Sequence, residues 1–342
     1  MADRNNKNAK SSVKDIRQAT LLSKLDLQKD ERLTRIPIET GRISHFFRTF
    51  KTNYAEIMLS NLLFMVFALP AIAVIFFVVP NMIKTLNAGL DFNGDMGIGL
   101  GGKNEILQGM LNIYNTWQWG FLMLVPCIAL MGIGFAGLFY CMRNYLWGAP
   151  VKIRVHFFRG IKKRWAEFLL SFTYVGFVVW AVGFSILEYL KNSLQGAANA
   201  GHWVFMIASC FIALLSLLFL MNALPMFVSF KYKFKSVVKN SVIFSITMLL
   251  IEMILIVLLA LPFLLLLSSF TKMIFYVAFA MIGFGFYAMA ITALAHNFFD
   301  STIIPLYEYE LKNKEKEERK EREREMRIAN ANRKNSKKKN KR

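Results

Sequence analysis

One acidic residue stands inside an otherwise apolar stretch of the chain. Glu252 is the only charged residue in the run 249–254, which reads LLIEMI. A charged side chain at the centre of a membrane costs about 2.5–3.5 kcal/mol, so Glu252 is expected to face protein or to be protonated. A cation-coupled transporter would use such a carboxyl group to bind a proton or Na⁺. The alternative is a protonated structural group that hydrogen-bonds to a neighbouring helix.

Asn222 is the predicted partner of Glu252. It stands three residues before Pro225 in a second apolar run. Because proline has no N–H, it frees a backbone carbonyl one turn earlier in a helix. Glu252, Asn222 and Pro225 therefore form the predicted intramembrane polar site.

Motifs of enzyme chemistry are not found in a suitable context. The four histidines are far apart and form no i,i+4 pair. Gly132–Gly137 fits GxGxxG, but it lies inside an apolar run with no preceding strand. Asp91–Asp95 begins like a calcium loop, yet Met96 stands where that loop requires glycine. The sequence predicts no catalytic residue, no metal site and no cofactor, and an enzyme is the least supported class.

Six apolar runs must position these groups. Each run is close to the roughly 20 residues that a helix needs to cross the hydrocarbon core. A crossing segment must satisfy its backbone hydrogen bonds internally, so each run is predicted to be a helix. The predicted helices cover residues 59–79, 120–140, 168–190, 204–227, 242–266 and 273–295. The expected fold class is an all-α membrane protein, with a bundle of six transmembrane helices in residues 41–300.

Lys and Arg are unevenly distributed among the connections. Most of the 42 lie in the N-terminal segment, the second and fourth connections and the C-terminal segment; the exceptions are Lys84, Lys103, Lys191 and Lys272. The positive-inside rule places the four basic segments in the cytoplasm. The prediction is a multi-pass protein of a bacterial plasma membrane with both termini cytoplasmic. The net charge of +20 then favours anionic lipid headgroups over nucleic acid as a partner.

A basic and aromatic segment occurs twice. Residues 45–60 and 156–171 share nine identities in sixteen positions without a gap, and a weaker third copy begins at Phe234. Aromatic residues at helical spacing among cations are typical of interfacial helices. The repetition predicts short amphipathic helices on the cytoplasmic side and a parallel repeat of two-helix units. The predicted docking residues are His45, Phe46, Phe47, Arg48, Lys51, His156, Phe157, Phe158, Arg159 and Lys162.

The two ends of the chain differ from the apolar region. Residues 1–40 lack apolar periodicity, which predicts a disordered cytoplasmic tail. In residues 301–342, Glu alternates with Lys and Arg at i,i+4 spacing before a final basic stretch. This pattern predicts a charged cytoplasmic helix followed by a basic tail.

Several short motifs carry a resemblance to a known family. They are Asn61-Leu62-Leu63-Phe64 through Leu69-Pro70, then Gly137-Leu138-Phe139-Tyr140 followed by Arg143, and His156-Phe157-Phe158-Arg159. With these motifs, residues 41–300 resemble the YesL-like family of uncharacterised bacterial integral membrane proteins. The resemblance implies a compact multi-helix membrane protein, of a kind often encoded beside carbohydrate ABC transporters and sugar-degrading enzymes. It supplies no catalytic or binding residues.

Three functions are open at this point. The resemblance and the repeated segments predict an accessory or regulatory membrane protein that docks against a carbohydrate-uptake system, with carbohydrate ABC transporter subunits as partners. A small secondary transporter or channel that uses Glu252 and Asn222 is the first alternative. A scaffold that binds anionic lipid or RNA through residues 333–342 is the second.

Overall fold

The computed structural model describes residues 42–88, 103–230, 232–299, 319 and 321–326. The chain divides into two compact units, Asp30–Ala295 and, as the second, Met1–Lys29 with His296–Arg342. The predicted N-terminal tail and the final basic tail lie outside the described residues. Of the predicted C-terminal helix, residues 319 and 321–326 are described, and they are helical.

The described part of the chain forms helices and their connections, without strands, and six helical spans are long and apolar enough to cross a membrane. The fold class is therefore an all-α membrane protein with six spans, as predicted. The spans are Tyr54–Leu86, Leu107–Leu146, Ile153–Leu194, Ala200–Ser229, Leu249–Leu267 and Ser269–Phe298.

Several spans contain more than one helical element. The α-helices are α2 (Arg42–Thr52), α3 (Tyr54–Ala73), α4 (Val79–Leu86), α5 (Lys103–Leu146), α6 (Ile153–Leu194), α7 (Ala200–Ser229), α8 (Phe234–Thr247), α9 (Leu249–Ala260), α10 (Ser269–Ala278) and α11 (Phe284–Phe298). Between them lie two π-helical segments, η2 (Val74–Val78) and η4 (Phe279–Gly283), and the 3₁₀-helix η3 (Leu261–Leu267).

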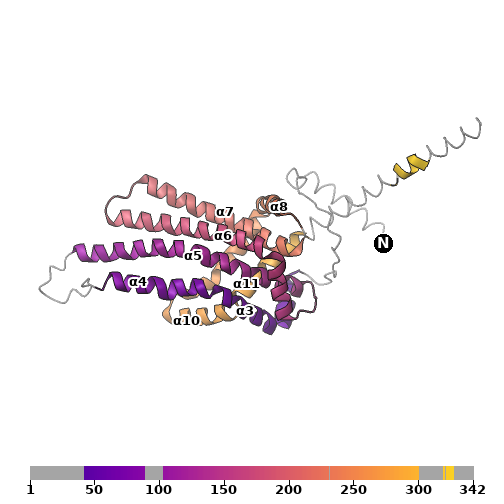
Figure 1. The fold of residues 1–342 in the computed structure, drawn as a ribbon, viewed down its shortest axis with the longest axis horizontal. Helices are drawn as coiled ribbons and strands as arrows, with labels where there is room; N and C mark the ends of the chain where they lie inside the picture. Colours follow the sequence, from indigo (N-terminus) through magenta and orange to yellow (C-terminus); the bar gives the residue numbers. More distant parts are fainter. Residues whose placement is uncertain (1–41, 89–102, 231, 300–318, 320, 327–342) are drawn as a thin grey trace, which may run out of the picture. The chain divides into compact units, whose positions relative to one another are not determined.

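Glycine residues let α5 and α6 approach closely. The two helices run side by side in Figure 1. A Cβ atom added at Gly132 of α5 would lie 2.8 Å from the carbonyl oxygen of Phe168, and one added at Gly160 of α6 would lie 2.8 Å from that of Ala136. Because backbone carbonyls cannot move aside alone, only glycine fits at these positions. Gly132 and Gly160 therefore mark a close contact between the two helices.

Replacing Gly160 by valine is expected to lower the free energy of unfolding by about 1–3 kcal/mol, the usual cost of overpacking a tight contact. The added atoms would push α6 away from the carbonyl of Ala136. Thermal unfolding in detergent measures the loss. Ala166→Val is the matched control, because Ala166 is an exposed residue of the same helix. Equal melting temperatures for the two variants would contradict the close contact.

The two copies of the repeated segment have the same environment. Positions 50–61 and 161–172 are buried, half-buried or exposed in the same order. The Ser60 hydroxyl donates to the carbonyl oxygen of Glu56 at 2.8 Å, and the equivalent Ser171 hydroxyl donates to that of Glu167 at 2.8 Å. The sequence repeat is therefore also a repeat of structure.

The backbone of the two copies differs at one position. In the first copy, α2 is separated from α3 by a turn at Asn53, whose side-chain amide donates to the Thr49 carbonyl at 2.9 Å. Such local side-chain bonds compete with a regular helix. The equivalent Arg164 instead reaches another helix, and α6 continues unbroken from Ile153. The prediction of a separate interfacial helix is thus wrong for the segment that contains His156.

The predicted fifth helix, residues 242–266, is also wrong in its extent. The chain forms α8, a turn at Met248, then α9 and η3. Pro262 has no N–H to continue the α-helical pattern, and the 3₁₀-helix begins beside it. The other five predicted helices lie within longer observed spans.

Candidate functional site

Three of the four predicted basic segments meet at one end of the Asp30–Ala295 unit. The Nε2 atom of His45 in α2 lies 2.9 Å from the carbonyl oxygen of Leu146 at the end of α5. Arg164, near the start of α6, donates to the carbonyl oxygen of Phe230 just after α7 at 2.7 Å. We call this end of the unit, formed by α2, the end of α5, the start of α6 and the end of α7, the basic end.

Six of the predicted docking residues point outward. Phe47 and Phe158 are 60% and 56% exposed. The four cations are also exposed: Arg48, Lys51, Arg159 and Lys162. Tyr54 and Trp165 are exposed at equivalent positions one turn after the lysines. We call these two equivalent sets of four residues the basic-aromatic stripes; their members are Phe47, Arg48, Lys51 and Tyr54, and Phe158, Arg159, Lys162 and Trp165.

The other four predicted docking residues serve internal contacts. Phe157 is fully buried and Phe46 is half-buried with its ring 5.9 Å from that of Phe286. His45 contacts the end of α5 as described, and Nδ1 of His156 lies 3.0 Å from the backbone nitrogen and oxygen of Lys152. These side chains stabilise the fold, so the candidate contact surface is reduced to the stripes.

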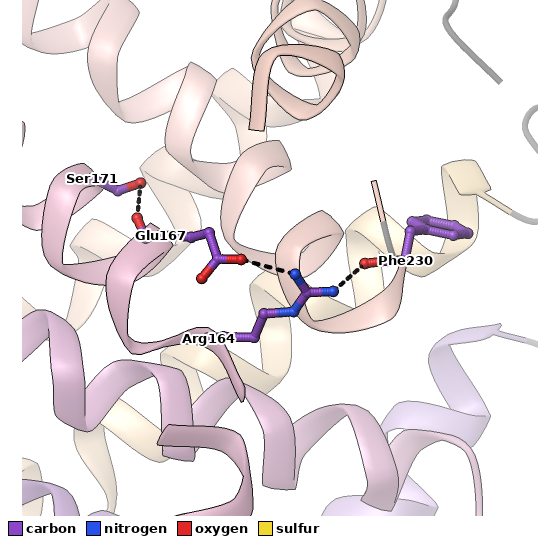
Figure 2. A network of polar contacts seen from close by, with 4 residues as sticks. All are labelled: Arg164, Glu167, Ser171 and Phe230. Carbon is purple, nitrogen blue, oxygen red and sulfur yellow. Dashed lines mark hydrogen bonds and ion pairs between the residues drawn. The ribbon is translucent and has the colours of Figure 1, made fainter. Parts of the chain in front are cut away.

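An arginine of α6 binds the chain at the end of α7. Figure 2 shows the Arg164 guanidinium between Glu167 and Phe230. Its Nη1 atom lies 2.9 Å from Oε1 of Glu167, and its Nη2 atom donates to the Phe230 carbonyl at 2.7 Å. The last carbonyls of a helix have no partner within that helix and carry partial negative charge. A cation that donates hydrogen bonds there supplies the missing partners and balances the partial negative charge.

Arg143 of α5 makes a similar contact from the other side. Its Nη1 atom donates to the carbonyl of Val228, in the last turn of α7, and its Nη2 atom donates to Oδ1 of Asn144 at 2.7 Å. The guanidinium lies 4.3 Å and 4.7 Å from the ring centroids of Tyr140 and Trp147. We call Arg143 and Arg164 the arginine clamp. Neither arginine was among the predicted site residues. For Arg143 the sequence contained a signal, namely a cation beside aromatic residues at the end of an apolar run.

The predicted intramembrane site brings Asn222 and Glu252 together. Nδ2 of Asn222 in α7 donates to Oε1 of Glu252 in α9 at 2.6 Å. The same amide lies 3.1 Å from Oγ of Ser245 in α8, whose hydroxyl donates to the Ser241 carbonyl at 2.9 Å. Glu252 and Asn222 are only 1% and 2% exposed. Sequence spacing therefore identified a real contact between α7 and α9.

The second carboxyl oxygen of Glu252 is buried and has no hydrogen-bond partner among the described residues. Pro225 is buried one turn after Asn222 in α7, where it has no N–H to donate. The arrangement is thus a carboxyl group held through one oxygen by a neutral amide.

A second buried amide joins the first span to the last. Asn61 of α3 is fully buried; its Nδ2 atom donates to the Ala280 carbonyl at 2.7 Å, and its Oδ1 atom accepts from the Gly285 amide at 2.8 Å. Ala280 and Gly285 are five residues apart, the spacing of a π-helical hydrogen bond, and the Asn61 side chain bridges them. Asn61 was missed as a site residue, although it is the one amide in the predicted first helix.

Comparisons with known proteins find no similar protein. No family model matches the chain, and no curated protein or solved structure is found to be similar to it. The assignment therefore rests on the six apolar spans, and they identify the chain as a multi-pass integral membrane protein.

Proposed function

We propose that this protein is an accessory or regulatory component of the bacterial plasma membrane that associates with a carbohydrate-uptake system. The basic end faces the cytoplasm, and the basic-aromatic stripes contact anionic headgroups and the cytoplasmic side of a transporter. The observation that carries the proposal is the repetition of the stripes. The equivalent residues Phe47 and Phe158 stay exposed while their neighbours Phe46 and Phe157 pack inward.

The polar side chains inside the bundle support an accessory role over transport. Asn61 binds two backbone groups of the last span, and Arg143 and Arg164 bind carbonyls at the end of α7. Polar groups used in this way stabilise helix packing. The exposed groups that could bind a partner lie in the stripes. Cations and aromatic rings there suit both the membrane interface and a protein partner.

The proposal is tested by isolating the tagged protein from its native membrane in a mild detergent and identifying co-purified proteins by mass spectrometry. Subunits of a sugar permease are the expected partners. Lys51→Gln combined with Lys162→Gln should weaken their recovery about tenfold, since each exposed charge pair contributes up to about 1 kcal/mol.

Lys84→Gln combined with Lys272→Gln is the matched control, because both residues are exposed lysines, in α4 and α10, outside the four basic segments. This variant should retain the partner. The proposal fails if the wild-type protein never associates with a transport component and its deletion leaves sugar uptake unchanged.

A further inference from the structure

The α9 helix is attached to the bundle by very little buried surface. Glu252 is its only buried residue, whereas Leu250, Ile254 and Val257 are 77%, 60% and 59% exposed. Lipid chains are as apolar as leucine, so an aliphatic helix gains no hydrophobic free energy by packing against another helix in a membrane. The position of α9 must therefore depend on specific contacts.

Two polar contacts hold α9 near its two ends. Near the start, Asn222 donates to Oε1 of Glu252 at 2.6 Å. At the end, the Tyr287 hydroxyl donates to the Leu259 carbonyl at 2.5 Å. The turn at Met248 and the 3₁₀-helix η3 separate α9 from the helices before and after it. The helix α9 is thus a separate element, attached to its neighbours by a hydrogen bond near each end.

The surroundings of Glu252 fit a neutral carboxylic acid. The helix α9 contacts α7, α8, η3 and, through Tyr287, α11; among the described residues none of these elements brings an ionisable side chain to Glu252. Oε1 accepts from an uncharged amide, and Oε2 is buried with no partner in the part of the chain that the structure describes. A buried carboxylate with one neutral hydrogen bond and no counter-charge is strongly disfavoured. A protonated acid places its hydroxyl at Oε2 and leaves Oε1 as the acceptor.

We infer that Glu252 is a proton-binding site within the membrane and that its neutral acid, held by Asn222, latches α9 to α7. This inference does not rest on the proposed accessory function. An exposed ionised carboxylate would draw α9 toward water or the interface, whereas the neutral acid keeps it in the apolar layer.

Infrared spectroscopy of the full chain in lipid nanodiscs at neutral pH tests whether Glu252 carries a proton. The difference between wild type and Glu252→Gln should contain the C=O stretch of a protonated carboxylic acid. Asn222→Leu should shift that band, because the oxygen loses its donor. A carboxylate band in the same difference spectrum would overturn the inference.

The latch is tested with a hydrophobic carbodiimide, a reagent that dissolves in lipid and adds to protonated carboxyl groups. In the wild type, burial of Glu252 should make labelling slow. Asn222→Leu should raise the labelling rate about tenfold, as expected when one intramembrane hydrogen bond that holds the docked state is lost. Tyr287→Phe removes the other polar contact of α9 and should leave the rate at Glu252 within about twofold of wild type.

Equal labelling of Glu252 in the wild type and in Asn222→Leu would overturn the latch, since it would show that Asn222 does not control access. Thermal unfolding of Glu252→Gln supplies an independent check. Its melting temperature should match the wild type, because glutamine keeps an acceptor oxygen for Asn222. A loss as large as that of Glu252→Ala would show that the ionised form is required.

Discussion

Asn61→Leu is expected to lower the free energy of unfolding by about 2–6 kcal/mol, because two backbone groups between the spans would each lose a partner at about 1–3 kcal/mol. Those groups are the Ala280 carbonyl and the Gly285 amide. Leucine has the same number of side-chain heavy atoms in the same branched arrangement, so the loss would not come from a cavity. Unfolding by a denaturing detergent, followed by circular dichroism, measures the change.

Ser60→Ala is the matched control for Asn61→Leu. Ser60 is equally buried and adjacent, but its hydroxyl donates to the carbonyl of Glu56 in its own helix. The hydroxyl also lies beside Cys141 and Tyr145 of α5. Because Ser60→Ala leaves no backbone group of another span without its partner, the control should lose only about 1 kcal/mol. Asn61→Asp retains the acceptor for Gly285 and should fall between the two. Similar stabilities for Asn61→Leu and Ser60→Ala would show that the hydrogen bonds of Asn61 to Ala280 and Gly285 do not stabilise the fold.

Arg143→Met is expected to cost about 2–4 kcal/mol, the sum of a charge-assisted hydrogen bond and a cation–π contact. The variant leaves the Val228 carbonyl without its donor and removes the cation between Tyr140 and Trp147. The end of α7 should loosen, and trypsin should cleave after Lys233 faster than in the wild type. Thermal unfolding and timed proteolysis together measure both effects.

Arg143→Lys separates geometry from charge at the same position. Lysine keeps the positive charge but lacks the planar fork that contacts Val228 and Asn144 together, so much of the loss should persist. Arg159→Gln removes an exposed cation of the same basic end and should leave the melting temperature unchanged. If Arg159→Gln destabilised the protein as much as Arg143→Met, general charge loss would explain the effect and the clamp would not.

Patterns that are local in the chain predicted much of this molecule. Apolar runs of sufficient length predicted the six spans, and the grouping of Lys and Arg predicted that basic segments would share one end. The spacing of Asn222 before Pro225 pointed to a partner for Glu252, and the two side chains are in contact. The repeated segment predicted a repeat of structure, and Ser60 and Ser171 make the same hydrogen bond in its two copies.

Helix boundaries depended on contacts that those patterns do not contain. The copies of the repeat differ because Asn53 bonds to its own backbone, whereas Arg164 reaches Phe230 across a helix interface. The break at Met248 divides a continuous apolar run between α8, which has one buried face, and α9, whose one buried residue is Glu252. Hydropathy assigns both sides of that break to one helix because their compositions are alike.

By itself, the sequence determined the membrane class, the six spans, the repeat and the one acidic residue that had to be buried or neutral. Only the tertiary structure decided that Asn61 bridges Ala280 and Gly285, that Arg143 and Arg164 clamp α7, and that four of the ten predicted docking residues serve internal contacts. The physical reason is that lipid and leucine are equally apolar. Hydropathy therefore reports whether a segment enters the membrane, while the rotation of each helix is fixed by close packing and hydrogen bonds between distant residues.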